Sequence, residues 1–507
     1  MFRAPIRHLP RPLKGAPSHF PRLAAMLLLV ACSWACGGAA ERPIKAAGSV
    51  LWIEPATVSS LDPERVDQLR QAGIRELFLE GAEMRWEGSQ PTLTGEPVPR
   101  SLPRAPVTLV IRGPWPRALA DDAEVAAAGL DAALDRLRLQ AEGQGILPVG
   151  FHFAPAAGEP YSLASLAAVL SARQGTDLFL SIEIPPRTLG TDEAAEAVRA
   201  ADFVVANLLG QRPEEAERPE AWRSADADAA VAALEALGAR YLVGVVTLGA
   251  AYRLGGDGER VAMTTQASPK DLVRHRALER TRARLLEGWD RRVLGARAVR
   301  ATELAGWKLA KGEKVEAIQL LPVHLIDLRD RLRFDNLSGY LGESYYRLPR
   351  TGEGLSLAVA DLVDALTGVT TEPHLEISIP QRQTSGETVA FRVWLRNLSE
   401  RSTDVAFYDQ NYVEVTVEGG VVVDVAPGEF ERYAFEQDGL PIRNMRALRS
   451  ANGVKLFVPI VEGGDAVRSG TILVRGRPGR PPALIVGGRF LLPGGGEMTL
   501  ARRAVAQ

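Results

Sequence analysis

Three glutamates each stand at the end of a segment that we predict to be a strand, and they offer carboxyl groups for acid–base chemistry. They are Glu54, Glu80 and Glu183. Glycoside hydrolysis needs one carboxyl as the acid and a second as the base or nucleophile. We therefore take Glu183, Glu80 and Glu54 as candidate catalytic residues. The opposing interpretation is that Glu54 and Glu80 cap loops or pair with Arg75 or Arg112.

Aromatic and polar side chains near the same strand ends could bind a ligand. Aromatic faces stack on sugar rings, and polar groups fix a ligand's orientation. His152 should point away from its neighbours Phe151 and Phe153, and a purely structural histidine is the competing interpretation. No His, Asp or Glu spacing matches a metal motif, and we expect neither a metal nor a cofactor. The binding candidates are Trp52, Trp86, Trp115, His152, Asn207 and Tyr252.

Strand-like and helix-like segments alternate over residues 48–370, which predicts a parallel sheet. Eight such units favour a closed (β/α)8 barrel, and no nucleotide-binding glycine motif supports an open sheet. The residues 84–101 read as a loop. Expected strands are Ser49–Val58, Arg75–Leu79, Val107–Ile111, Leu147–Phe153, Leu178–Ile184, Phe203–Leu208, Tyr241–Leu248 and Val315–Leu321. Expected helices are Pro63–Ala72, Glu124–Gln140, Leu163–Ala172, Glu193–Ala200, Asp226–Leu237, Pro269–Trp289 and Leu355–Leu366.

Barrel closure would bring distant residues together, because all strands of a barrel end at one mouth. We expect Glu80 and Glu183 to face one cleft, with Glu54 close by. Trp52 alternates with Glu54, so it could instead fill the barrel interior. The expected eighth strand is followed by His324 and Asp327.

The pattern changes near Thr370, where helical periodicity stops and alternating apolar segments begin. Glycine- and proline-containing turns separate these segments. This predicts an all-β sandwich of immunoglobulin-like type over 371–507. We place the domain boundary between about Gly368 and Pro373.

The N-terminal segment has the parts of an export signal. A basic leader precedes the short apolar run Leu23–Val30, which falls well below the roughly 20 residues of a membrane span. Leu29-Val30-Ala31-Cys32 resembles the bacterial lipobox, in which the cysteine thiol is acylated after cleavage. This implies a signal peptide over 1–31, a tether over 32–47 and membrane attachment through lipid on Cys32. A plain secretory signal is the alternative.

Composition narrows the remaining classes of function. The chain has 60 basic and 62 acidic residues, so its net charge is −2 and nucleic-acid binding is not expected. Its two cysteines, Cys32 and Cys36, both lie near the N-terminus, which excludes a disulfide framework in the folded part. By resemblance to enterobacterial sorting, Ser33 after Cys32 favours the outer membrane of the cell envelope.

Several segments together resemble a bacterial family with a glycosidase-like barrel, known only as a domain of unknown function. They are the lipobox, Leu51-Trp-Ile-Glu-Pro55, Leu147-Pro-Val-Gly-Phe-His-Phe153, Leu178-Phe-Leu-Ser-Ile-Glu-Ile184 and the run from Asp202 to Arg212. The resemblance covers roughly 48–370 and implies an envelope lipoprotein that acts on or binds a glycan. In that family the fourth strand tends to end in Asp, whereas here it reads Gly150-Phe-His-Phe-Ala-Pro155. This departure puts catalysis in question. Two alternatives stay open: a non-catalytic barrel that docks another protein, and a metal-assisted hydrolase using His152 and strand-end carboxylates.

Overall fold

The computed structural model describes residues 48–95, 105–173, 178–209, 224–281, 284–285, 291–334, 337–369, 371–380, 382–407, 409–478, 482–493 and 495–504. Ala46–Gln507 form one compact unit. The expected signal peptide, Cys32 and Cys36 lie outside the described residues, so the lipid anchor stays a prediction. Within the described ranges, no helix combines the length and the apolar character needed to cross a bilayer.

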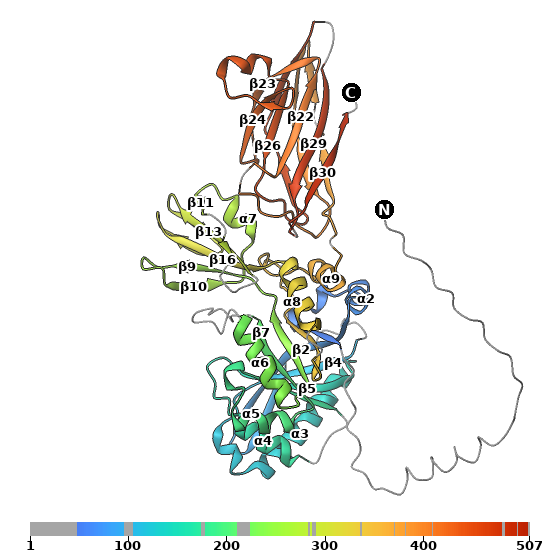
Figure 1. Cartoon of the computed structure of the whole chain (residues 1–507), viewed down its shortest axis with the longest axis vertical. Coiled ribbons are helices and arrows are strands. Elements are labelled where there is room, and N and C mark those ends of the chain that lie inside the picture. The colour runs from blue at the N-terminus through green and yellow to red at the C-terminus, as the bar shows by residue number, and fades with distance from the viewer. Residues whose placement is uncertain are drawn as a thin grey trace, which may run out of the picture. The chain divides into compact units, whose positions relative to one another are not determined.

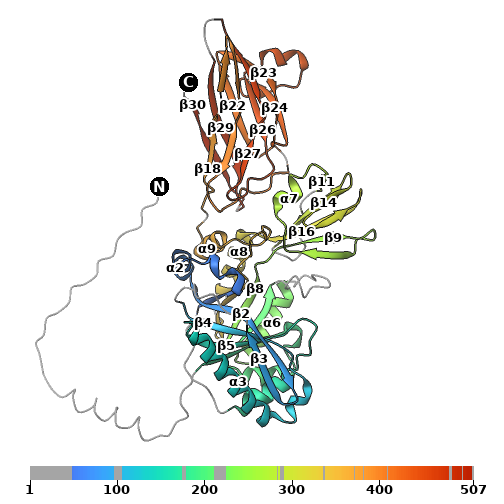
Figure 2. The same ribbon diagram turned by 180° about the vertical axis from the view of Figure 1, so that it is seen from behind.

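Eight parallel strands close into a TIM-like barrel (Figures 1 and 2), which confirms the predicted fold of this region. Strand β1 pairs with β2 on one side and with β17 on the other, and these pairings close the sheet. In order around the barrel, the strands are β1 Ser49–Ile53, β17 Tyr340–Tyr346, β8 Tyr241–Val246, β7 Phe203–Leu209, β6 Phe179–Ile184, β5 Pro148–Ala154, β4 Val107–Arg112 and β2 Ile74–Glu87.

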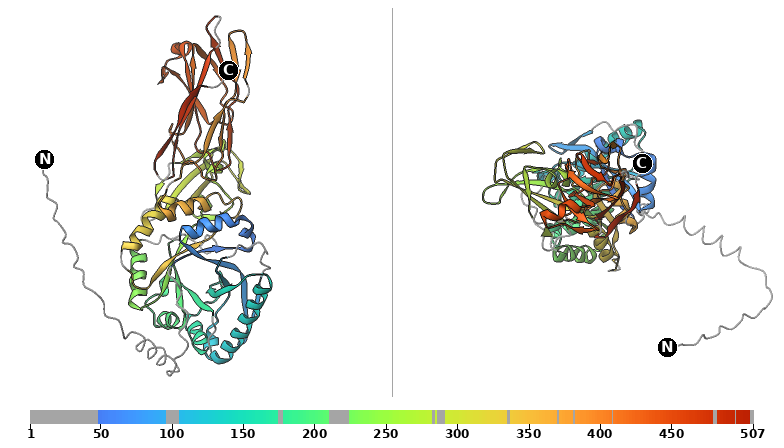
Figure 3. Two further views of the ribbon diagram at one scale, coloured as in Figure 1. Left: turned by 90° about the vertical axis from the view of Figure 1, so that its right-hand side faces the viewer. Right: turned by 90° about the horizontal axis from the view of Figure 1, so that it is seen from above.

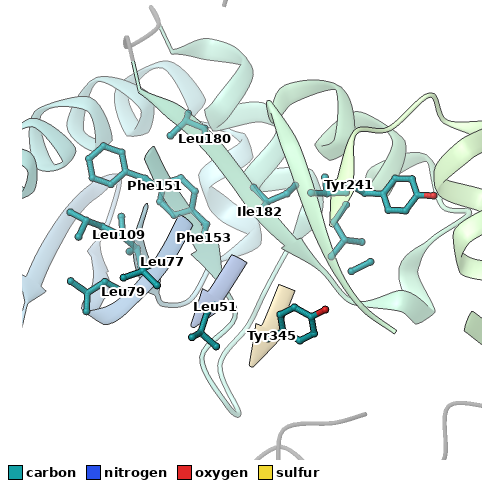
Figure 4. Close-up of a cluster of buried hydrophobic side chains, with 14 of the residues drawn as sticks. Leu51, Leu77, Leu79, Leu109, Phe151, Phe153, Leu180, Ile182, Tyr241 and Tyr345 are labelled. Atoms are coloured by element: carbon teal, nitrogen blue, oxygen red, sulfur yellow. The ribbon is translucent and has the colours of Figure 1, made fainter. Parts of the chain in front are cut away.

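Alternation along each strand divides the barrel core into two layers. Outward side chains such as Leu51, Leu77, Phe151 and Ile182 form the cluster shown in Figure 4, which packs under the surrounding helices. Inward side chains form a second buried cluster inside the barrel: Val50, Trp52, Phe78, Val110, Ala154, Phe203, Val205, Leu242, Val246, Leu248 and Tyr346. Burial of each large side chain contributes about 1.5–3 kcal/mol, so both layers stabilise the barrel.

Helices surround the barrel, as the left view of Figure 3 shows. Several begin where the sequence supplies a cap: Asp62, Ser162 and Thr191 each accept a hydrogen bond from a first-turn amide. The α-helices are α2 Pro63–Gln71, α3 Ala123–Gly143, α4 Leu163–Ala172, α5 Asp192–Ala200, α6 Ser224–Ala236, α7 Pro269–Val273, α8 Pro322–Phe334 and α9 Val359–Thr367. Short 3-10 turns are η1 Pro55–Ser60, η2 Arg117–Ala120, η3 Pro186–Thr188 and η5 Met445–Ser450.

The expected loop after the second strand is largely a hairpin. Strand β2 continues to Glu87 and turns at Gly88, and β3 (Gln90–Gly95) returns antiparallel to it. Gly88 has φ +62°, a conformation that glycine adopts without steric penalty, so the chain can turn tightly there. The sequence of this stretch resembles an irregular loop, and the hairpin was therefore not predicted. The remainder of the expected loop, from 96 to 101, lies outside the described residues.

Two sequence predictions between β8 and β17 were wrong. The expected helix Pro269–Trp289 ends at Val273, and strand β11 follows because it pairs with β13. The expected eighth barrel strand is β16, which pairs antiparallel with β9 and β13. The strands inserted here are β9 Ala250–Leu254, β10 Arg260–Thr264, β11 Leu278–Arg280, β12 Arg284–Leu285, β13 Arg291–Ala298, β14 Thr302–Leu304, β15 Trp307–Leu309 and β16 Lys314–Leu320.

The physical reason for both errors is tertiary pairing, which overrides local propensity. An apolar strand has the same pattern whether its partners run parallel or antiparallel. The true eighth strand, β17, carries Glu343 and Ser344 and is less apolar than β16. As a consequence, His324 and Asp327 lie on α8 and not at a strand end.

Antiparallel sheets make up the last part of the chain, in agreement with the predicted all-β class. Element type changes between α9, which ends at Thr367, and β18, which begins at Leu375. The domain boundary and the immunoglobulin-like arrangement both stay predictions. One sheet has the order β18-β21-β27, a second β19-β20-β28-β23 and a third β25-β24-β26-β22-β29-β30. Their bounds are β18 Leu375–Ser378, β19 Arg382–Ser385, β20 Thr388–Phe391, β21 Trp394–Asn397, β22 Tyr412–Glu418, β23 Gly420–Val425, β24 Arg432–Gln437, β25 Leu440–Pro441, β26 Gly453–Phe457, β27 Ala466–Arg468, β28 Ile472–Gly476, β29 Ala483–Leu491 and β30 Glu497–Ala504.

Candidate functional site at the barrel mouth

Glu54 directly follows β1, Glu80 directly follows Leu79, the last β2 residue that pairs with β1, and Glu183 is the penultimate residue of β6. Glu54 and Glu80 each stand two positions beyond an inward residue, Trp52 and Phe78, so alternation directs them to the barrel's interior side. Glu183 has the opposite parity to Ile182, which belongs to the outer layer. We define the barrel mouth by Glu54, Glu80, Arg112, Glu183, Asn207 and Arg347.

Glu80 is held by Arg112, which ends the neighbouring strand β4. Nε of Arg112 donates to Oε1 of Glu80 at 3.0 Å, and Nη2 donates to the same oxygen. Nη1 donates to the carbonyl of Pro155 at 3.1 Å. The Arg112 guanidinium also lies 5.8 Å from the ring centroids of both Trp52 and Tyr346. Of the two partners that the sequence offered for Glu80, the structure selects Arg112.

Glu54 belongs to a second charged group, which ties β1 to the segment after β17. Nε of Arg347 lies 3.0 Å from Oε1 of Glu54, and Arg350 pairs with the other oxygen. Arg347 also donates to both oxygens of Glu353, at 3.1 and 3.0 Å. Burial would lower the pKa of Arg347, but its hydrogen bonds to Glu353 and the charge of Glu54 outweigh this effect and raise that pKa. Glu54 therefore belongs to a charged cluster with Arg347, Arg350 and Glu353, which we call the clasp.

Glu183 accepts a hydrogen bond from Nδ2 of Asn207 on the next strand, at 2.7 Å. Gly244 on β8 makes room for this amide, because a Cβ there would lie 2.0 Å from Oδ1 of Asn207. Two of the predicted site residues are therefore in direct contact, on neighbouring strands β6 and β7.

His152 and Trp52 fill the barrel just below the mouth. Nδ1 of His152 lies 2.9 Å from Oγ of Ser181, and its ring packs against Trp52 and Phe78 at centroid distances of 5.2 and 5.1 Å. The indole N–H of Trp52 donates to Oγ of Ser344 at 2.7 Å. Both side chains are at most 1% exposed. Trp52 thus fills the barrel interior and His152 is a buried structural histidine, as the competing interpretations of these two residues proposed. Neither ring has a face available to a ligand.

The other aromatic candidates lie away from the mouth. Trp115 has no exposed surface and packs edge-on against Phe153 in the outer layer. Trp86 stands on the β2 extension, where its indole donates to the Pro114 carbonyl at 2.9 Å. Tyr252 belongs to β9 of the inserted sheet, and Arg260 covers its ring at 4.2 Å.

Sequence reasoning missed Tyr346 and Arg347 because it misplaced the eighth strand, which ends at Tyr346 and is directly followed by Arg347. Arg112 was recognised only as a partner for Glu80, although its position two residues beyond the inward Val110 marks it as a mouth residue. The metal-assisted alternative would need a set of metal-binding side chains around one point. Within the described ranges, no group of three or more His, Cys, Asp or Glu side chains is placed to hold a metal ion.

The fold and the mouth define a (β/α)8-barrel protein with an inserted antiparallel sheet and a C-terminal all-β region. No protein-family model matches the chain, and no curated protein matches it in sequence. Among solved structures, it is similar to a chitinase from Chromobacterium violaceum ATCC 12472, at 13% identity over 64% of this chain and 98% of the other, with a TM-score of 0.44. It is also similar to the Bacillus cereus spore cortex-lytic enzyme SleL, at 14% identity over 65% and 75%, with a TM-score of 0.42. A third is a glycoside hydrolase family 18 N-acetylglucosaminidase from Paenibacillus barengoltzii, at 11% identity over 63% and 99%, with a TM-score of 0.40. All three TM-scores are below 0.5, so these likenesses do not bear on what this chain binds.

Proposed function

We propose that this protein binds a glycan at the barrel mouth and does not hydrolyse it. The observation that carries the proposal is that each strand-end carboxylate has its own fixed partner. Arg112 holds Glu80, Arg347 and Arg350 hold Glu54, and Asn207 holds Glu183. Such groups present donors and acceptors in fixed directions, which is what binding of sugar hydroxyls requires.

Hydrolysis would require a different arrangement of the same residue types. A glycosidase keeps one carboxyl in an apolar pocket as a proton donor and a second carboxylate ready for water or for the sugar. Here Glu80 is engaged by two guanidinium N–H groups, and Glu54 lies between two arginines. Strand β5, the fourth barrel strand along the sequence, carries His152, and this side chain packs against the rings of Trp52 and Phe78.

The binding proposal is tested by titrating the purified full chain with chito-oligosaccharides and with soluble peptidoglycan fragments in a calorimeter. The same mixtures are then analysed for new reducing ends after prolonged incubation. We expect saturable binding of at least one glycan and no product. Absence of binding to both glycan classes, or the appearance of new reducing ends, would contradict the proposal.

We also propose that the protein is anchored in the cell envelope, at the outer membrane, by lipid on Cys32. The support is the lipobox-like Leu29-Val30-Ala31-Cys32 and the absence of cysteine after Cys36. Replacing Cys32 by Ser should move the protein from the detergent phase to the aqueous phase on phase partitioning. Cys36→Ser is the matched control and should stay in the detergent phase. A Cys32→Ser protein that still partitions with detergent would refute the anchor.

A second candidate function is docking of another protein by a barrel that has lost its ligand site. The observation that favours it is the filled interior, in which Trp52, Phe78 and Tyr346 are each at most 3% exposed. Under this alternative no glycan binds, and substitutions at Glu80 or Glu183 affect stability alone. The titration above separates the two candidates.

A further inference from the structure

Asp361 on helix α9 stands apart from the paired acids of the barrel mouth. It lines two cavities, of about 250 and 80 Å³, that lie between α9 and the segment Glu400–Asp404. No hydrogen bond or ion pair holds its carboxyl within the described part of the chain. The feature is therefore a half-buried acid at a junction between two parts of one compact unit.

Its nearest charged neighbours already have partners. Arg401 binds Asp364 through two hydrogen bonds, from Nε to Oδ2 at 2.8 Å and from Nη2 to Oδ1 at 2.7 Å. Thr371 donates to both oxygens of Asp364 as well. Glu400 pairs with Arg65 of helix α2. Asp361 is left with two like charges beside it and a single arginine that is bound to another acid.

The other charged groups around these cavities do not change this balance. Asp404 pairs with Arg292 of β13, Glu353 pairs with Arg347, and Arg350 pairs with Glu54. Glu462, the remaining acid in the larger cavity, accepts a hydrogen bond from the backbone N–H of Lys270 at 2.8 Å, and burial raises its pKa. Of the described side chains of helix α8, those that line the smaller cavity are the uncharged Pro322, Val323 and Ile326.

These surroundings disfavour the charged form of Asp361. Its pKa is raised to about 6, chiefly by burial and to a smaller extent by Asp364 and Glu400, while the charge of Arg401 partly opposes the shift. The folded chain consequently holds a proton that the unfolded chain has released between about pH 4 and pH 6. The stabilisation is fully present below the unfolded-state pKa and is lost as the pH rises through about 6.

We propose that the junction between α9 and Glu400–Asp404 is a pH-responsive contact that tightens when Asp361 takes up a proton. At neutral pH the closed junction keeps an ionised carboxylate away from water, a cost that Arg401 offsets only in part and that opening of the junction relieves. In mildly acidic surroundings the neutral acid removes this cost, while the Asp364–Arg401 pair stays intact. The junction therefore opens more readily at neutral pH than at pH 5.

Hydrogen exchange of the full chain in detergent tests this directly, with peptides that cover α9 and residues 398–404. After correction for intrinsic exchange rates, we expect the opening constant to be roughly tenfold larger at pH 7.5 than at pH 5. Asp361→Asn should abolish this pH dependence and hold exchange at or below the wild-type pH 5 value.

Asp364→Asn is the matched control, because it removes the charge that Arg401 binds. Exchange in that variant should be faster than in the wild type at both pH values. Two results would overturn the proposal: wild-type opening constants that are equal at the two pH values, or an Asp361→Asn protein that keeps the wild-type pH profile. Should Asp361→Asn fail to fold, Glu462→Gln decides the matter: it removes the other acid of the larger cavity whose pKa burial raises, and it should keep the wild-type pH profile.

Discussion

The barrel mouth and the α9 junction treat acidic side chains in opposite ways. At the mouth, Glu54, Glu80 and Glu183 are each fixed by an arginine or an amide from a neighbouring element. At the junction, Asp361 has acids beside it, and the nearest arginine belongs to Asp364. The position of a carboxyl at a strand end suggested reactivity, but the charges and hydrogen bonds around it determine its protonation state and therefore its chemical role.

This difference separates two uses of buried charge. A paired group holds segments together and fails when its partner is removed, since the remaining charge is left without compensation. An unpaired group responds to the solution, because a change of pH alters its charge. The predictions below either remove partners at the mouth or neutralise the free acid at the junction, and they run from the largest expected effect to the smallest.

Arg347→Met should have the largest effect. It leaves Glu54 and Glu353 without their shared partner, and the side chain of Glu353 is fully buried. The free energy of unfolding should fall by about 3–5 kcal/mol. Urea unfolding of the full chain measures it. Arg350→Met is the control, because that side chain is half exposed and its loss should change stability by about 0–1 kcal/mol. Equal effects of the two variants would refute the clasp.

Gly244→Ala should have an intermediate effect. The new Cβ would meet Oδ1 of Asn207 and push the amide away from Glu183. Overpacking of this kind reduces stability by about 1–3 kcal/mol, and glycan affinity should fall with it. Gly143→Ala at the end of α3 is the matched control, since a Cβ there meets nothing within 4 Å. A Gly244→Ala protein with wild-type stability and affinity would show that Asn207 is free to move.

The smallest effect is expected from Asp361→Asn, and it has the opposite sign. The variant should be more stable than the wild type, because it removes an ionised group that the fold disfavours. This gain should be about 1 kcal/mol larger at pH 7.5 than at pH 5. Thermal unfolding at the two pH values measures the difference. A gain that is independent of pH, or a loss of stability at pH 7.5, would contradict the interpretation.

The first seven barrel strands could be predicted from the sequence because each is a short, mainly apolar segment, and helical segments alternate with most of them. Tyr241–Val246 is an example in which every residue is buried. The inserted sheet could not be predicted, because β16 reads like a barrel strand and only its partners β9 and β13 reveal its place. The same error hid Arg347, since it follows a strand that local pattern does not distinguish.

The candidate site was predicted in part. The alternation of side chains along a strand indicated inward positions for Trp52 and His152, and the two rings are in contact inside the barrel. The sequence also offered Arg112 as a partner for Glu80, and the structure shows this pair. The sequence alone did not show which of Glu54, Glu80 and Glu183 would be paired, because their partners come from other strands or from beyond β17. Trp115 and Tyr252 were selected by residue type, and burial in separate cores determines their role instead.

One pair of measurements tests the central claim, glycan binding without hydrolysis, most directly. Wild type and Glu183→Gln are compared for glycan affinity by calorimetry and for released reducing ends, with Glu196→Gln on the exposed face of α5 as the control. We expect no product from any of the three proteins and an affinity that is roughly three- to tenfold weaker for Glu183→Gln alone. Turnover by the wild type that Glu183→Gln abolishes would contradict the account and make Glu183 a catalytic residue.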